Sequence, residues 1–186
     1  MIKQLESEII YSDWKLVILL QKFVIPTNKT ISRLIIDGNV HPILILPIIV
    51  DNKIILQKQY RYAANKWLWE VPGGLREDNE TSLEGAKREL CEETGYMSDN
   101  FIKLGEQLWF DPALERISCD AYVALDCYKG NQVNRDFDEF VSSVQLFSSD
   151  EIFTMVDDGS IVDFKTLATI LLGRKYIEKY SYKRSF

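Results

Sequence analysis

The sequence predicts an α+β fold, an α/β/α sandwich in which helices cover a sheet. Short runs rich in β-branched and aromatic residues alternate with turn residues, and helices begin at clear capping signals. The elements follow one another as strands, helix, strands, helices, an order that favours this fold class. The chain has 186 residues, of which 46% are hydrophobic and 27% charged. This is the composition of an ordinary globular protein that can bury a core.

The N-terminal part of the chain is rich in strand-forming side chains. Residues 13–24 and 30–36 are typical of strands, and 37–39, with the sequence Asp-Gly-Asn, mark a turn. A sheet this small is marginally stable by itself. We therefore expect residues 1–40 to form a small β-rich segment that packs on a partner subunit or on the main domain, which spans 41–186.

The main domain begins with a predicted hairpin. The apolar runs 43–50 and 53–57 flank Asp51-Asn52, a polar pair suited to a tight turn. A short strand at 68–71 follows and ends at Pro72-Gly73-Gly74. Further along the chain we expect strands at 103–109, 117–125 and 140–147, and a loop at 131–137.

The first helix is bounded by capping residues. Thr81 followed by Glu84 forms a capping box, and Gly95 is a typical residue after a helix end, so the helix should reach Thr94. Its periodicity predicts a core-facing side made of Leu83, Ala86, Leu90 and Thr94.

Two more helices follow near the end of the chain. Ser148 with Glu151 forms a second capping box and opens a short helix that ends near Gly159. Asp163 caps a last helix that extends to about Lys179. One face of this helix carries Leu167, Ile170 and Leu171.

Charge and composition exclude several classes of function. The net charge is −6 without a basic run, which disfavours binding to nucleic acid. A single His excludes a multi-His metal site, and three Cys without a C-x-x-C pair fit neither a zinc knuckle nor a disulfide framework. The apolar run 43–50 is far shorter than the roughly 20 residues that span a bilayer. We expect no membrane partner and a cytoplasmic location.

Three carboxylates lie together on the first helix. Glu89, Glu92 and Glu93 share one face, because positions three and four apart on a helix are neighbours. Like charges destabilise a bare helix, and the helix dipole disfavours anions near the C-terminal end. Either Arg88 or a divalent cation could offset this charge, and oxygen ligands suit Mg²⁺ or Mn²⁺. The alternative is a solvated acidic face stabilised by Arg88 and Lys87.

The segment around this helix resembles the Nudix box, G-x5-E-x7-R-E-U-x-E-E-x-G-U, in which U is aliphatic. Its fixed positions match Gly74, Glu80, Arg88, Glu89, Glu92, Glu93 and Gly95. Leu90 fits the first U position, whereas Tyr96 stands at the last, where an aliphatic residue is commoner. The resemblance implies a Nudix fold, with a mixed sheet between helices and the box as loop–helix–loop. It also implies hydrolysis of a nucleoside diphosphate linked to another moiety.

The resemblance implies roles for the residues of the box. Water attacks a phosphorus of the pyrophosphate with the help of divalent cations, Mg²⁺ or Mn²⁺. The expected metal ligands are Glu89, Glu93 and the carbonyl of Gly73, with Glu92 as an additional ligand and catalytic candidate. Supporting roles in the loop and in ligand orientation fall to Gly74, Glu80, Arg88 and Gly95.

The general base is often a glutamate outside the box. Glu139 matches that position best, and Glu115 is its rival. Either could equally be an ordinary surface acid.

Other segments are similar to ADP-ribose pyrophosphatases and related sugar-nucleotide hydrolases. These are Gln59-Tyr60-Arg61, residues 69–74, and Pro112 downstream of the box. The similarity implies that Arg61 and Pro112 contact the substrate, although Arg61 could instead form a salt bridge at a strand end. The expected reaction converts ADP-ribose or a related nucleoside diphosphate sugar to AMP or another nucleoside monophosphate and a sugar phosphate. The loop 111–116 departs from the subfamily pattern, which leaves the sugar end open.

The same subfamily implies a homodimer in which exchanged N-terminal strands build the base pocket. Trp14 and Phe23 are the candidates for stacking on the base. Two alternatives remain: hydrolysis of GDP-mannose or another nucleoside diphosphate derivative, and a nucleotide-binding domain without catalysis. Non-catalytic Nudix domains usually lack box glutamates, and none is missing here.

Overall fold

A mixed sheet lies at the centre of the larger part of the chain. The computed structural model describes residues 1–130 and 141–182. Its elements are β1 (Lys3–Ser12), β2 (Val17–Val24), β3 (Thr30–Asp37), β4 (Ile43–Ile49), β5 (Ile54–Arg61), β6 (Lys66–Glu70), α1 (Ser82–Thr94), β7 (Tyr96–Met97), β8 (Asn100–Trp109), β9 (Ser118–Lys129), β10 (Val141–Phe147), α2 (Ser149–Asp157) and α3 (Phe164–Tyr182). The sheet has seven strands in the order β10-β5-β4-β9-β7, with β6 on β5 and β8 on β9. β4 pairs in parallel with β9 and antiparallel with β5, so the sheet is mixed, as predicted.

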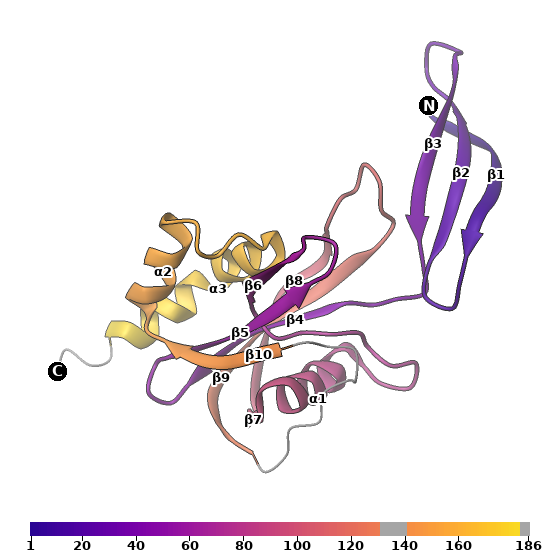
Figure 1. Ribbon diagram of the computed structural model, residues 1–186. Coiled ribbons are helices and arrows are strands. Elements are labelled where there is room, and N and C mark those ends of the chain that lie inside the picture. Colours follow the sequence, from indigo (N-terminus) through magenta and orange to yellow (C-terminus); the bar gives the residue numbers. More distant parts are fainter. Residues whose placement is uncertain (131–140, 183–186) are drawn as a thin grey trace. The chain divides into compact units, whose positions relative to one another are not determined.

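The central strand β4 is buried on both sides. Ile43 packs with Leu90 of α1 in one core cluster. On the opposite side, α3 approaches so closely that a Cβ atom on Gly173 would lie 2.2 Å from the Leu46 side chain. Figure 1 shows α1 on one side of the sheet and α2 with α3 on the other. This arrangement confirms the predicted α/β/α sandwich, and it explains why β4 is uniformly apolar.

Both predicted capping boxes are present. The N–H of Glu84 donates to the hydroxyl of Thr81, and the N–H of Thr81 donates to the Glu84 carboxylate at 2.7 Å. Ser148 and Glu151 make the same pair of contacts at the start of α2. Gly95 ends α1 with a φ of 74°, a left-handed conformation that favours glycine. The sequence therefore predicted the ends of the box helix correctly.

A second compact unit comprises Met1–His41 with Gln107–Cys119, and the remaining residues form the core unit. The N-terminal unit contains an antiparallel sheet in the order β1-β2-β3. The strand prediction at 13–24 was wrong at its start, where β2 begins only at Val17. The reason is a turn in which the Asp13 carboxylate accepts hydrogen bonds from the N–H groups of Lys15 and Leu16. β1 was not predicted. The division into 1–40 and 41–186 stays a prediction.

Two leucines differ from the predicted helix faces. Leu83 is 39% exposed and Leu171 is 69% exposed. In α1 the buried side instead includes Glu89 and Glu93, because that side faces the loop that precedes the helix. In α3 the buried side is shifted toward Thr166 and other small or β-branched residues, which allow its close approach to β4.

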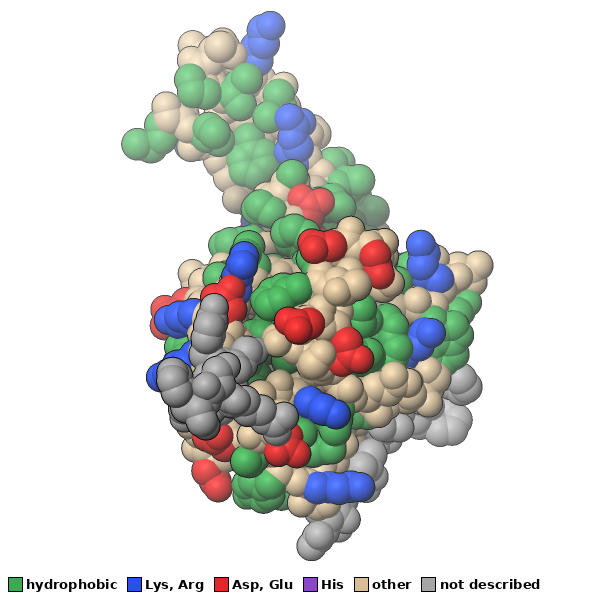
Figure 2. All heavy atoms as spheres, turned by 90° about the vertical axis from the view of Figure 1, so that its left-hand side faces the viewer, with side chains coloured by type: hydrophobic (Ala, Val, Ile, Leu, Met, Phe, Trp, Pro, Cys, Tyr) green, Lys and Arg blue, Asp and Glu red, His purple; other side chains and the backbone are tan. Residues whose placement is uncertain are grey.

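The predicted strand at 140–147 corresponds to β10, whereas the loop predicted at 131–137 lies outside the described residues. Within residues 1–130 and 141–182, no helix is both long and apolar enough to cross a membrane. On the face drawn in Figure 2, the described basic side chains lie scattered among acidic and hydrophobic ones.

Candidate active site

Helix α1 presents its acidic side chains toward the loop that precedes it. Glu93 is 2% exposed and Glu89 is 9% exposed, whereas the Glu92 side chain is 38% exposed. Ala86 and Leu90, both 0% exposed, belong to the same buried side of the helix and anchor it in the core. The apolar stripe thus fixes the rotation of α1, and this rotation directs the acids into the site.

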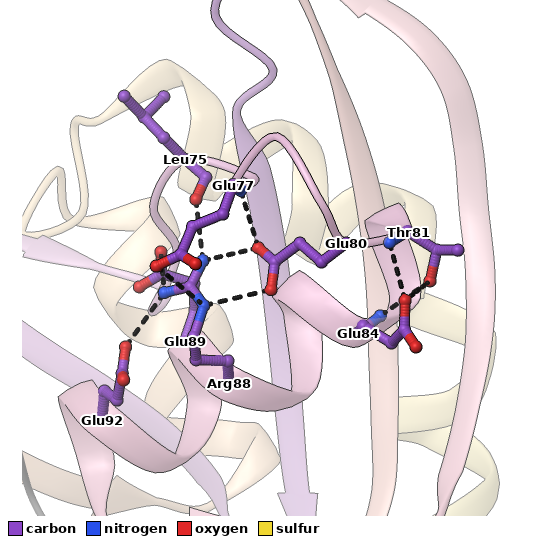
Figure 3. A network of polar contacts seen from close by, with 8 residues as sticks. All are labelled: Leu75, Glu77, Glu80, Thr81, Glu84, Arg88, Glu89 and Glu92. Carbon is purple, nitrogen blue, oxygen red and sulfur yellow. Dashed lines mark hydrogen bonds and ion pairs between the residues drawn. The ribbon is translucent and has the colours of Figure 1, made fainter.

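Arg88 is the centre of a polar network that Figure 3 shows from close by. Its guanidinium donates to Glu80 at 2.7 and 3.2 Å and, through one nitrogen, to Glu89 and Glu92 at 2.9 Å each. It also donates to the carbonyl of Leu75 at 2.9 Å. Because these partners come from both the helix and the preceding loop, Arg88 ties the two segments together.

Glu80 belongs to the loop side of this network. Its Oε1 atom accepts a hydrogen bond from the backbone of Glu77 at 2.8 Å, in addition to the contacts from Arg88. The hydrogen bond from Arg88 lowers the pKa of Glu80 below its usual value, and the carboxylates around Arg88 raise the pKa of the guanidinium. Both groups are therefore charged at neutral pH.

The Gly73-Gly74 loop closes against α1. The N–H of Gly73 donates to Oε2 of Glu93 at 2.7 Å. A Cβ atom on Gly74 would lie 2.3 Å from the Glu89 carboxylate. The same loop bonds to β4, since the N–H of Ile43 donates to the carbonyl of Gly74 at 2.8 Å. The absence of side chains in this loop thus makes room for a box carboxylate.

The donor set of the site fits a hard divalent cation. Glu89, Glu92 and Glu93 offer only carboxylate oxygens, the ligand type that Mg²⁺ and Mn²⁺ prefer. The carboxylates of Glu89 and Glu92 converge on one point, at present contacted by a nitrogen of Arg88. Within the part of the chain that the structure describes, no three acidic, His or Cys side chains are already arranged around a common metal position.

Comparisons with known proteins identify the family. A model described as "NUDIX domain" matches residues 41–169. The chain belongs to the Nudix family. The methanol dehydrogenase activator of Bacillus methanolicus is 30% identical over 171 residues, which cover 90% of each chain. ADP-ribose pyrophosphatase of Bacillus subtilis (strain 168) is 26% identical over 171 residues, again 90% of each chain.

A solved structure supports the fold assignment. The crystal structure of an ADP compounds hydrolase matches with a TM-score of 0.84 and 18% identity, and the match covers 96% of this chain and 95% of that one. The expectation of a Nudix hydrolase with an α+β fold is therefore confirmed. Nudix hydrolases generally use divalent metal ions, in agreement with the donor set described above.

The predicted Nudix site residues outside the box are spread over the chain. Arg61 forms two hydrogen bonds to Glu70, at 2.8 and 2.6 Å, the salt bridge that the sequence left open as an alternative. Pro112 and Glu115 lie in the N-terminal unit. Glu139 falls outside the described residues. The functional roles of these residues stay predictions.

Four polar residues next to the Nudix box escaped the sequence analysis. Glu70, 2% exposed, holds Arg61 and lies 3.6 Å from Lys165 of α3. The buried Thr166 accepts a hydrogen bond from the N–H of Val71 at 3.0 Å, and this contact ties α3 to the strand before the loop. Gln57 contacts the box directly through Glu93. The sequence signal that could have identified Gln57 is a polar side chain that follows an apolar run, as in β5.

Proposed function

We propose that this Nudix hydrolase cleaves the pyrophosphate bond of ADP-ribose or a related nucleoside diphosphate sugar in a divalent-metal-dependent reaction. The products are AMP, or another nucleoside monophosphate, and a sugar phosphate. The observation that carries the proposal is the convergence of Glu80, Glu89 and Glu92 on Arg88, with Glu93 held by the adjacent loop. The similarity to ADP-ribose pyrophosphatase of Bacillus subtilis over 90% of both chains supports the substrate class.

The proposed roles follow from the contacts. Glu89, Glu92, Glu93 and the carbonyl of Gly73 would hold Mg²⁺ or Mn²⁺. Such a cation neutralises phosphate oxygens and lowers the pKa of a bound water. Arg88 keeps the carboxylates within one small region. Structural support comes from Gly74, Glu80 and Gly95.

Glu139 and Glu115 are proposed as candidates for the general base, and Glu92 as a further catalytic candidate. Arg61 is proposed as a phosphate or ribose contact, because Glu70 fixes its guanidinium. We also propose that Pro112 contacts the substrate and that the protein forms a homodimer. A monomer at micromolar concentration in light scattering would count against the dimer.

Hydrolysis of a substrate panel tests the proposal. ADP-ribose, ADP-glucose, GDP-mannose, diadenosine polyphosphates and NADH are each incubated with Mg²⁺ or Mn²⁺, and released phosphate is measured after phosphatase treatment. We expect preference for ADP-ribose or a close relative. A Glu93→Gln substitution should lower turnover more than about 100-fold, because it removes a metal ligand. Glu84→Gln, an exposed capping residue on the same helix, is the matched control and should keep turnover.

The outcomes separate the alternatives. Preference for GDP-mannose or another sugar nucleotide would retain the reaction and move specificity to the loop 111–116. Absence of turnover on every substrate, with nucleotide binding retained, would favour the non-catalytic alternative and refute the proposal.

A second candidate function is regulation of a dehydrogenase. It is favoured by the 30% identity to the methanol dehydrogenase activator over 90% of both chains. The test adds wild-type protein or the Glu93→Gln variant to a methanol dehydrogenase assay. Stimulation by both proteins would indicate regulation that does not need hydrolysis, and stimulation by the wild type alone would connect the two activities.

A further inference from the structure

Strand β5 places an amide side chain beneath the acidic face of α1. Gln57 is 1% exposed and lies in a strand whose preceding residues, Ile54, Ile55 and Leu56, are completely buried. A buried amide costs free energy unless its polar atoms are hydrogen-bonded. A position in such an apolar run would ordinarily be occupied by another aliphatic residue, so the contacts of Gln57 need an explanation.

The contacts of Gln57 point to the box. Its Nε2 atom donates to Oε2 of Glu93 at 3.1 Å and lies 3.4 Å from Oε1 of Gln59. The same Oε2 atom of Glu93 accepts the N–H of Gly73 at 2.7 Å. One carboxylate oxygen of Glu93 therefore receives two donors, one from β5 and one from the loop, and these fix the plane of the carboxylate.

The other half of the Gln57 amide indicates that the residue does not serve stability alone. Among the residues that the structure describes, Oε1 of Gln57 has no hydrogen-bond partner. An unsatisfied buried acceptor is destabilising, whereas a hydrogen bond to a charged group is favourable by a comparable amount. These two contributions offset one another. The net contribution of the amide to the folding free energy is thus close to zero, whereas its hydrogen bond still orients the carboxylate of Glu93.

We propose that Gln57 is a positioning residue for Glu93, which sets the affinity of the site for its divalent cation and, through it, the rate of hydrolysis. This inference rests on the proposed function for the identity of Glu93 as a metal ligand. Gln57 does not touch the substrate in this scheme. Its removal should lower kcat and metal affinity and leave KM for the nucleotide unchanged.

The test compares Gln57→Met with wild-type protein. Methionine has a similar shape and lacks both the donor and the unsatisfied acceptor. Binding of Mn²⁺ is measured by the electron paramagnetic resonance signal of the free ion, without nucleotide, and thermal unfolding is measured in EDTA. We expect Mn²⁺ affinity and kcat to fall about 10-fold, the lower end of the range for residues that orient metal ligands, with the unfolding temperature nearly unchanged.

The matched control is Thr169→Val. Thr169 is 0% exposed and its hydroxyl donates only within α3, to the carbonyl of Lys165 at 2.7 Å. This variant removes a buried hydrogen bond distant from the box and should keep Mn²⁺ affinity and kcat. Equal losses in both variants would overturn the proposal, since they would reflect general loosening of the core unit.

Two further outcomes are decisive. Mn²⁺ affinity within twofold of wild type in Gln57→Met would overturn the proposal. Gln57→Leu is a second variant that replaces the amide with an apolar side chain. Failure of both variants to fold would assign Gln57 a structural role and would also overturn the proposal. If the wild type hydrolyses nothing but binds Mn²⁺ in a Gln57-dependent manner, the proposed function fails while the positioning role stands.

Discussion

The Arg88→Met substitution tests how the acidic helix is held together. Arg88 is 24% exposed at its side chain and donates to three carboxylates and one backbone carbonyl. Methionine keeps most of the aliphatic contacts and removes every donor. Glu80 and Glu89, whose side chains are 15% and 12% exposed, then lose the positive charge of Arg88.

The size of the effect follows from burial. Removing one partner of a buried ion pair costs about 3–5 kcal/mol, because the remaining charge is left unpaired. Water reaches part of the Arg88 network, so we take the lower end, about 3 kcal/mol. Repulsion between Glu89 and Glu92 adds a few tenths of a kcal/mol. For a chain of this length, the expected fall in unfolding temperature is about 6–12 °C.

Urea unfolding at neutral pH in EDTA measures the effect without a metal ion. Arg174→Met is the matched control, because Arg174 forms an exposed salt bridge with Glu178 four residues on in α3, with a side chain 60% exposed. Such a pair contributes about 0.5 kcal/mol or less. A loss below about 1 kcal/mol for Arg88→Met, or equal losses for the two variants, would refute the view that Arg88 holds the loop and helix together.

Three further predictions concern the Nudix box and the thiols. The pKa of Glu80 is lowered in the fold by Arg88, so its contribution to stability is complete above about pH 4.5 and is lost as the pH falls below that value; the difference in unfolding free energy between wild type and Glu80→Gln should therefore shrink between pH 6 and pH 3 in urea titrations. Gly74→Ala should displace the Glu89 carboxylate, since the new methyl group would lie 2.3 Å from it, and lower turnover at least about 10-fold with little change in unfolding temperature. Half-buried Cys91 should react with a thiol reagent under native conditions before Cys119 and Cys127, as followed by mass spectrometry of peptides. The latter two thiols are buried, and burial raises the pKa of Cys127 to about 12. Early labelling of either buried thiol would contradict the structure.

Local sequence signals predicted much of the core unit. The two capping boxes and Gly95 are short-range features, and each contains in a few residues the donors and acceptors that define a helix end. The hairpin of β4 and β5 was likewise predicted from a polar pair between apolar runs, although the turn has three residues, 50–52, because the N–H of Ile49 donates to the carbonyl of Lys53. The parallel pairing of β4 with β9 joins residues far apart in the chain, and no local pattern reports it.

The part of the candidate site that lies within one continuous segment, the Nudix box, was predicted from the sequence. The box residues are close in sequence, so their spacing on a helix follows from its geometry. The partners that come from elsewhere were missed. Gln57 lies on β5, and Thr166 reaches Val71 from α3, so only the tertiary fold reveals either contact. Likewise, Leu83 satisfied the helical period, but α1 turns its acids partly inward and leaves this leucine at the surface.

The inward turn of α1 resolves the conflict that the sequence presents. Three like charges near the C-terminal end of an isolated helix oppose its formation. In the fold, Glu89 receives a donor from Arg88 of the same helix, which is itself bound to the preceding loop, and Glu93 receives donors from that loop and from β5. The helix therefore depends on its surroundings for stability, and a peptide of residues 81–95 should show little helix in water. The same donors restrict how the carboxylates can turn, so the contacts that make the acidic face tolerable also give it the defined geometry that a metal-dependent hydrolase requires.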